Sequence, residues 1–272
     1  MFLPSDRPAY EAASARVMST LRSFPQVVVE EWGWDEAFVG VHTNGGPERM
    51  AAELQAGVRA ETGLSCAIGI GETKLQAKTA TSFAKPGGIA RLTRGRWIDV
   101  MGDRPVTAVW GIGDRTALRL ADLGVRTVVD LARADEEQLA RAFGPRIGPH
   151  LKVLGLGGDD EPVVGEPYVA KGRSKEETFV RDLTDLGEVE RHVARLATEV
   201  TEAVAAGGRR VTHVAVKLRT ATFLTRTKIR KLPAPTSDVA EVVAGALIVL
   251  ERFDLRDPIR PIRLIGVRVV LE

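Results

Sequence analysis

The spacing of apolar residues predicts three regions of different architecture. In residues 6–23 apolar side chains recur every three or four positions, which is the period of a helix packed on a core. Short runs rich in Val, Ile and Phe alternate with further helical patterns, so we expect helices packed on one face of a sheet. The predicted helices of this region are 6–23, 47–62 and 73–83, and the predicted strands are 26–32, 37–43 and 65–71.

The middle of the chain changes to short helical segments separated by glycines. Asp135 is a candidate N-cap for one of them, with Gln138 three residues on. A stretch rich in Gly, Pro and acids follows, and beyond it the order is strand, helix, strand, strand, helix, strand. The sequence therefore predicts an α+β multidomain protein. Its predicted parts are an α/β sheet domain at 1–95, an all-α domain at 96–160, a linker at 161–167 and a βαββαβ domain at 168–272.

Two adjacent acids, Asp35 and Glu36, lie between the first two predicted strands. With 36 acidic residues in 272, chance alone gives about five adjacent acid pairs, so the pair by itself is weak evidence. The acids either mark a solvated turn or hold a cation for chemistry. Neighbouring residues of a regular strand point to opposite faces, so they can share a site only through a local distortion.

A glycine–apolar–glycine hairpin between two helical segments occupies residues 106–125. Gly111 and Gly113 leave the backbone uncovered, and Arg115 lies in the first turn of the next helix. Bare N–H groups at a helix start bind phosphate without reading a base. The pattern indicates DNA-backbone binding; the alternative is an ordinary turn between two helices.

Basic residues gather near the C-terminal end. From Arg209 to Lys231 there are eight Lys or Arg and no Asp or Glu. Strand alternation suggests that two neighbouring strands present one basic face, which favours contact with a nucleic-acid backbone over a merely solvated sheet face. The predicted members of that face are Lys217, Arg219, Arg226, Lys228 and Arg230, with His213 beside them.

Three lysines follow the third predicted strand. Lys74 and Lys78 are one helical turn apart, and Lys85 lies beyond the helix end. They are candidates for contact with phosphates of a nucleotide or a primer strand, and ordinary surface lysines are the alternative. The histidines lack the spacing of zinc ligands.

Composition limits the class of protein without naming it. The formal net charge is only +2, so any affinity for nucleic acid must come from local clusters. The single cysteine excludes an internal disulfide and fits a reducing cytosol. No run approaches a membrane-spanning length and no apolar signal core begins the chain, so a cytoplasmic protein without membrane contact is expected. We also expect the protein to be a monomer.

Taken together, the stretches WDEAFVGV, CAIGIGETKLQAKTATSFAKPGGI, VTAVWGIGDRTALRLADLG, KEETFVRD and RPIRLIGVRVV resemble the Y-family of translesion DNA polymerases, in particular the bacterial DNA polymerase IV branch. The resemblance covers nearly the whole chain. It implies a partial palm at 1–95, a thumb at 96–160 and a DNA-clasping little finger at 168–272. It also implies error-prone nucleotidyl transfer onto a primer 3′-hydroxyl, with primer–template DNA and deoxynucleoside triphosphates as partners.

The resemblance assigns roles to several residues. Asp35 and Glu36 match acids that bind two Mg²⁺ ions, Lys85 matches a lysine that contacts the incoming triphosphate, and the 111–113 hairpin matches the thumb's grip on the primer strand. Lys74, Lys78 and Arg115 are expected to contact DNA. Gly33 and Trp34 depart from the family motif, which has a small polar and an aliphatic residue there.

The family's first strand, with a further metal-binding Asp, and its fingers domain have no counterpart in this sequence. We therefore expect weak Mg²⁺ binding and a chain that is a fragment, a mis-started reading frame or a degenerate paralogue. The alternative function is a non-catalytic DNA-binding homologue that assists lesion bypass; a nuclease or glycosylase is less well supported. The apolar C-terminal tail that binds the sliding clamp is also missing, so the sequence does not support recruitment by that route.

Overall fold

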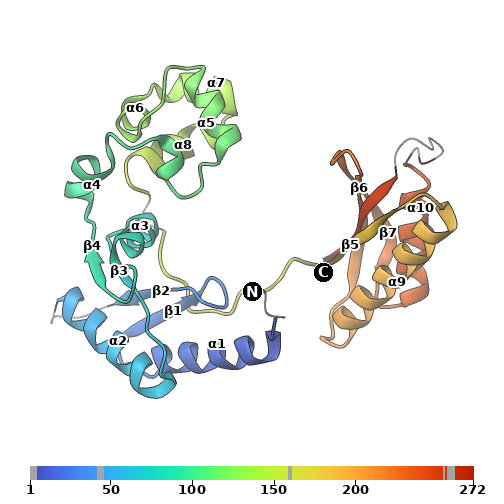
Figure 1. The fold of residues 1–272 in the computed structure, drawn as a ribbon, viewed down its shortest axis with the longest axis horizontal. Helices are drawn as coiled ribbons and strands as arrows, with labels where there is room; N and C mark the ends of the chain where they lie inside the picture. Colours follow the sequence, from blue (N-terminus) through green and yellow to red (C-terminus); the bar gives the residue numbers. More distant parts are fainter. Residues whose placement is uncertain (1–4, 42–45, 159–160, 254, 256–260) are drawn as a thin grey trace. The chain divides into compact units, whose positions relative to one another are not determined.

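The computed structural model describes residues 5–41, 46–158, 161–253, 255 and 261–272. The chain divides into two compact units, Met1–Pro167 and Tyr168–Glu272, coloured blue to yellow and yellow to red in Figure 1. Each unit has its own cluster of buried apolar side chains. Among the described residues, none of the helices has both the length and the apolar surface required to cross a lipid bilayer.

The first unit combines two small sheets with helices. Strands β1 and β2 form an antiparallel hairpin, and β3 pairs in parallel with β4. The elements, in chain order, are α1 (Arg7–Arg22), β1 (Val27–Glu31), β2 (Ala37–Val41), α2 (Pro47–Thr62), β3 (Ile68–Ile70), α3 (Lys74–Ala84), β4 (Ile89–Arg91), α4 (Arg94–Met101), the 3₁₀ turn η1 (Val106–Ala108), α5 (Asp114–Ala121), α6 (Val128–Arg133), α7 (Glu136–Phe143) and α8 (Ile147–Gly155).

The helix boundaries follow from local chemistry. Helix α2 ends at Gly63, whose positive φ of 74° closes the helix in the left-handed conformation that glycine adopts without strain. The Asp135 carboxylate accepts a hydrogen bond from the Gln138 N–H and caps α7, as predicted. The segment before the glycine hairpin is the single turn η1 and not a longer helix, so the predicted first helix of this motif is shorter than expected.

Helix α3 lies directly on β3, at a distance that leaves no room for side chains. A Cβ atom added to Gly69 would lie 2.0 Å from the Ala77 carbonyl oxygen, and one added to Gly71 would lie 2.5 Å from the Ala77 nitrogen. Only glycine permits this approach between a strand and a helix backbone. The two glycines therefore fix the position of α3 against the sheet.

The same helix joins the helical segments that follow. Leu75 and Ala80 belong to one apolar core with Trp97, which is 1% exposed and donates a hydrogen bond from its indole N–H to the Gly155 carbonyl at 2.8 Å. The Thr73 hydroxyl donates to the Gly157 carbonyl at 2.6 Å. One continuous core thus crosses residue 95, where the sequence predicts a boundary between domains.

The second unit is a four-stranded antiparallel sheet in the order β5-β8-β6-β7, with α9 and α10 over one face (Figure 1). This βαββαβ arrangement and the α+β class confirm the predicted fold. The elements are β5 (Gly172–Leu183), α9 (Leu186–Ala205), β6 (Val211–Thr220), β7 (Thr225–Thr236), α10 (Val239–Leu250) and β8 (Ile262–Leu271).

The register between β6 and β7 corrects the predicted basic face. Directly paired residues of an antiparallel sheet point to the same side, and Val216 pairs with Lys228 whereas Lys217 pairs with Thr227. Val216 is fully buried under the helices. Lys217 and Arg219 therefore lie on the open face, and the basic residues of β7 lie on the helix-covered side. The prediction that all five share one face is wrong because alternation within each strand leaves the relative register of two strands undetermined. The residues on the helix side are Arg226, Lys228 and Arg230.

The contact at Gly69 yields a stability prediction. Gly69→Ala should destabilise the first unit by about 3 kcal/mol or more, because the added methyl overlaps backbone atoms of α3 that have no freedom to move. Urea unfolding monitored by circular dichroism measures the change. The control is Gly95→Ala in α4, where an added Cβ meets nothing within 4 Å and should stabilise by about 0.5 kcal/mol. Equal effects of the two substitutions would contradict this packing.

Candidate functional site

The acid pair lies in the turn of the β1–β2 hairpin, outside both strands. The Trp32 and Gly33 N–H groups donate to the Glu36 carbonyl at 3.0 and 3.1 Å and close the turn. Asp35 is exposed and Glu36 is partly buried. Because both residues precede β2, strand alternation does not separate their side chains.

The lysines of α3 reach this hairpin. Lys78 Nζ lies 2.5 Å from a carboxylate oxygen of Glu36, and Lys74 Nζ lies 2.8 Å from a carboxylate oxygen of Glu30 on β1. The two lysines are one turn apart, so they project from the same side of the helix. The structure therefore brings Lys74 and Lys78 to the acids. Their role in DNA contact stays a prediction.

Glu30 also holds the linker to the first unit. Its carboxylate accepts the Val164 N–H at 2.7 Å in addition to the Lys74 ammonium. Partial burial raises the pKa of Glu30, but the hydrogen bonds from Lys74 and Val164 and the Lys74 charge outweigh it and hold the pKa below its ordinary value of 4.5. Val163 lies against Gly40 of β2, where an added Cβ would come within 3.1 Å of its side chain. The residues from Val163 to Val164 are thus docked on the hairpin.

Aromatic side chains connect the hairpin turn to the glycine hairpin. The Trp32 ring makes edge contacts with Phe38 at 5.8 Å and with Trp110 at 5.4 Å between centroids. Trp110 directly precedes Gly111, and Lys78 Nζ lies 5.7 Å from the Trp110 ring centroid. The acid pair, the lysines and the glycine hairpin therefore meet around one aromatic cluster, here defined as Trp32, Phe38 and Trp110.

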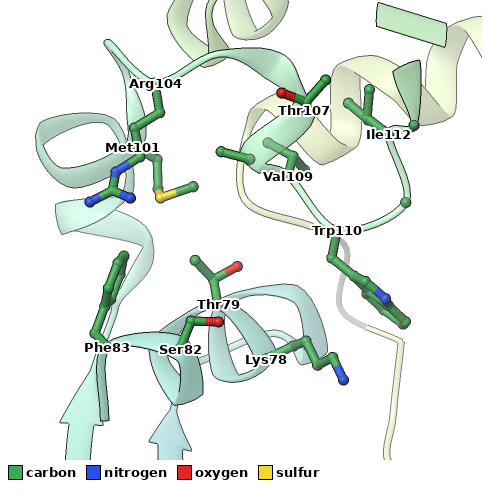
Figure 2. Close-up of a pocket in the computed structure, with 13 residues that line it drawn as sticks. Lys78, Thr79, Ser82, Phe83, Met101, Arg104, Thr107, Val109, Trp110 and Ile112 are labelled. Carbon is green, nitrogen blue, oxygen red and sulfur yellow. The ribbon is translucent and has the colours of Figure 1, made fainter. Parts of the chain in front are cut away.

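A cavity of about 610 Å³ lies between α3 and the segment that leads into the glycine hairpin (Figure 2). Figure 2 shows Lys78 beside Trp110 at one end and Phe83 beside Arg104 at the other. The Arg104 guanidinium is 5.0 Å from the Phe83 ring centroid. Both ends thus combine a cation with an aromatic ring, a combination suited to bases and phosphates.

The glycine hairpin has the backbone geometry that its sequence predicts. Gly111 adopts a positive φ of 98°, and Gly113 is the N-cap of α5 with no side chain over the helix start. Arg115 is exposed in the first turn of that helix. The first N–H groups of α5 have no partner within the helix and can bind an anion.

The remaining predicted residues make other contacts within their own units. Lys85 is the exposed C-cap of α3, and no contact joins it to the acid pair in the described residues. On the second unit, Lys217 is paired with both carboxylate oxygens of Glu176 at 2.9 Å, and the Arg219 side chain donates to the Thr225 hydroxyl. Lys228 donates to the Arg252 carbonyl beside α10.

Three residues of the site were missed by sequence reasoning. Glu30, Trp32 and Trp110 are distant in sequence from their partners, and no local pattern pairs them. The one available signal is the large aromatic residue Trp110 directly before the uncovered Gly111.

Family models match most of the chain. Residues 1–82 match the impB/mucB/samB family, residues 170–270 match the impB/mucB/samB family C-terminal domain, and residues 103–149 match the SAM-like helix-hairpin-helix tandem. The chain is 47% identical to a protein named DNA polymerase IV 2 of Mycobacterium tuberculosis, over 99% of this chain and 77% of that protein. It is 35% identical to a DNA polymerase IV of Methanoculleus marisnigri, over 99% of this chain and 74% of that protein.

Solved structures share the fold. A Y-family DNA polymerase chimera, Dbh-Dpo4(243-245)-Dbh, superimposes with a TM-score of 0.85 at 22% identity and covers 99% of this chain and 78% of that chain. A structure titled Dbh ternary complex (substrates partially disordered) matches with a TM-score of 0.61 at 21% identity, over 100% of this chain and 80% of that chain. At such identities the likeness establishes the fold alone.

The Glu30 contacts predict an acid-sensitive stability. A folded-state pKa below the ordinary 4.5 means that the stabilisation is complete above that pH and is lost as the pH falls through the lowered value. Glu30→Gln should therefore cost about 2 kcal/mol of unfolding free energy at neutral pH and progressively less in acid. Urea titrations at a series of pH values measure this difference.

The control for that experiment is Glu48→Gln. Glu48 also has a lowered pKa, caused by its hydrogen bond from Arg91, but the pair is half exposed on the surface. Solvent screening should make its effect clearly smaller. A pH-independent loss in Glu30→Gln would contradict the electrostatic origin of the contact.

Proposed function

Since the chain belongs to the Y-family of DNA polymerases, among the DNA polymerase IV proteins, we propose that it binds primer–template DNA and acts in error-prone synthesis past damaged template bases. The single observation that carries this proposal is the 47% identity to DNA polymerase IV 2, which extends over 99% of the chain. The substrates are then a primer 3′-hydroxyl and a deoxynucleoside triphosphate.

We assign the palm to residues 1–95, the thumb to 96–160, the linker to 161–167 and the little finger to 168–272. The exposed Gly111–Gly113 backbone and Arg115 would hold primer-strand phosphates. The open face of the second unit's sheet, with Lys217 and Arg219, would contact the DNA backbone elsewhere. Lys85 would contact the triphosphate. All of these contacts would be made to phosphate groups, so they would not distinguish one base from another.

Y-family polymerases use divalent metal ions, and the donor chemistry of the hairpin turn fits Mg²⁺. Asp35 and Glu36 offer the carboxylate oxygens that this ion prefers, and they would hold it. They make up only part of a complete ligand set: within the described residues, no group of three His, Cys, Asp or Glu gathers. When bound, the ion would lower the pKa of the primer hydroxyl and offset charge on the leaving pyrophosphate.

Lys78 has a defined part in this arrangement. Its ammonium lies 2.5 Å from a carboxylate oxygen of Glu36 and offsets the charge of that acid. When a cation occupies the acids, the Lys78 ammonium would be released toward the cavity between α3 and the glycine hairpin, where a primer phosphate would provide a new partner.

A second candidate function is a DNA-binding homologue without catalysis. The specific observation in its favour is that Glu36 is already paired with Lys78 and that the acids have no third ligand in the described part of the chain. The glycine hairpin and the basic residues would still bind DNA. Only the polymerase would extend a primer, whereas both proteins would bind DNA.

Primer extension with Mg²⁺ and all four deoxynucleoside triphosphates separates them. We expect extension by the wild-type chain and a loss of more than about a hundredfold in Asp35→Asn, because a metal ligand is removed. Glu31→Gln is the control, since Glu31 is an acid of the same hairpin that is paired with Arg22. DNA binding without any extension would favour the second function, and full activity of Asp35→Asn would contradict the assignment of Asp35.

The corrected sheet faces predict which basic residues bind DNA. The double variant Lys217→Ala and Arg219→Ala should reduce the slope of log K against log salt concentration by about 0.9 for each phosphate that is no longer neutralised. Arg226→Ala with Lys228→Ala, on the helix side, should change the slope less. Fluorescence anisotropy with labelled primer–template over a range of salt concentrations gives both slopes. The reverse order would place the DNA on the other side of the sheet.

A further inference from the structure

We propose that the exposed rings of Trp32 and Trp110 form a stacking surface for the nucleoside at the primer 3′ end. The inference rests on the proposed function and adds two positioning residues to it. Neither tryptophan belongs to the acids, lysines or glycines assigned above. Both lie where those groups converge.

The two tryptophans are open to solvent. Trp32 is 52% exposed and Trp110 is 40% exposed, whereas Trp97, which serves the core, is 1% exposed. A large ring that only filled space between two parts of the unit would be covered on most of its surface. Here the two indoles contact each other in an edge-on arrangement, and about half of Trp32 and two fifths of Trp110 remain exposed to solvent.

The rings are also held in place. Trp32 is fixed through its backbone hydrogen bond to the Glu36 carbonyl and through its contact with the buried ring of Phe38. Trp110 follows the buried Val109 in the chain, and its ring is held by contacts with Trp32 and Phe38 and by Lys78 beside it. Pre-positioned aromatic rings lose little freedom when a base stacks on them.

The rings lie between the groups assigned to the reaction. Trp32 lies in the turn that carries Asp35 and Glu36, and Trp110 adjoins the uncovered Gly111 backbone. A primer strand whose phosphates lie on the glycine hairpin and whose terminal hydroxyl points to the acids must pass this surface. The neighbouring Lys78 adds the positive charge that suits the strand's backbone.

Stacking of this kind accepts every base, since each base has an aromatic face. It would therefore suit a polymerase that must accept damaged or mispaired ends. The contribution expected from one aromatic platform is about a tenfold change in affinity, from the typical strength of base–aromatic stacking.

The chain contains a matched control on the same turn. Trp34 is 50% exposed, nearly the same as Trp32, but its ring contacts Arg7 of α1 at 5.0 Å and not the aromatic cluster. Trp32→Ala and Trp34→Ala thus remove the same side chain, at the same exposure, from two sides of one turn. A thermal melt of each variant confirms that both remain folded.

The test measures binding of the full chain to primer–template DNA that carries 2-aminopurine at the primer 3′ end. Indole stacking should quench this probe, and a probe placed well upstream in the duplex should respond less. We expect Trp32→Ala and Trp110→Ala to lose most of the terminal quenching and about tenfold in affinity. Trp34→Ala should match the wild type, and Trp32→Phe should retain most of the effect.

A closed dumbbell duplex has no 3′ end, so binding to it measures the general affinity for duplex DNA without the contribution of a primer terminus. On this ligand Trp32→Ala and the wild type should bind equally. Equal loss on both DNAs, or equal behaviour of Trp32→Ala and Trp34→Ala, would overturn the stacking surface while leaving DNA binding intact. Failure of the wild type to bind either DNA would overturn the proposed function, and the stacking surface with it.

Discussion

The architecture of the first unit depends on the contact between the backbone of helix α3 and strand β3. Gly69 and Gly71 allow the helix to approach to distances that any side chain would prevent. With α3 so placed, one of its faces enters the core beside Trp97, and another directs Lys74 and Lys78 to the hairpin acids. A helix displaced by a single methyl group would disturb both the core and the ion pairs, since close-packed interiors transmit strain.

Paired charges then determine how the candidate site is arranged. Glu30 binds Lys74 and the Val164 N–H, so one carboxylate connects the hairpin, the helix and the linker. Glu36 binds Lys78, whose ammonium also lies near the Trp110 ring. Two carboxylates of the hairpin are therefore paired with the two lysines of α3. The aromatic cluster provides the uncharged part of the same surface.

Local sequence patterns predicted the elements but not their mutual placement. The predicted helix 47–62, the Asp135 cap and the βαββαβ order follow from short-range signals, and all are confirmed. The shared basic face was wrong because cross-strand register depends on contacts between strands. The Trp32–Trp110 contact was missed for the same reason: it joins segments that only the folded chain brings together. Tertiary packing, and not propensity, decides both.

A photo-crosslink from the primer terminus tests most directly whether the hairpin turn and the glycine hairpin receive the primer end. A primer that ends in 5-iododeoxyuridine, which reacts with nearby aromatic rings, is annealed to a template, bound to the full chain and irradiated, and the adducts are mapped by mass spectrometry. We expect adducts at Trp32 or Trp110, next to the acid pair and the glycine hairpin. Adducts at Trp34 alone, or only in residues of the second unit, would contradict this placement of the primer.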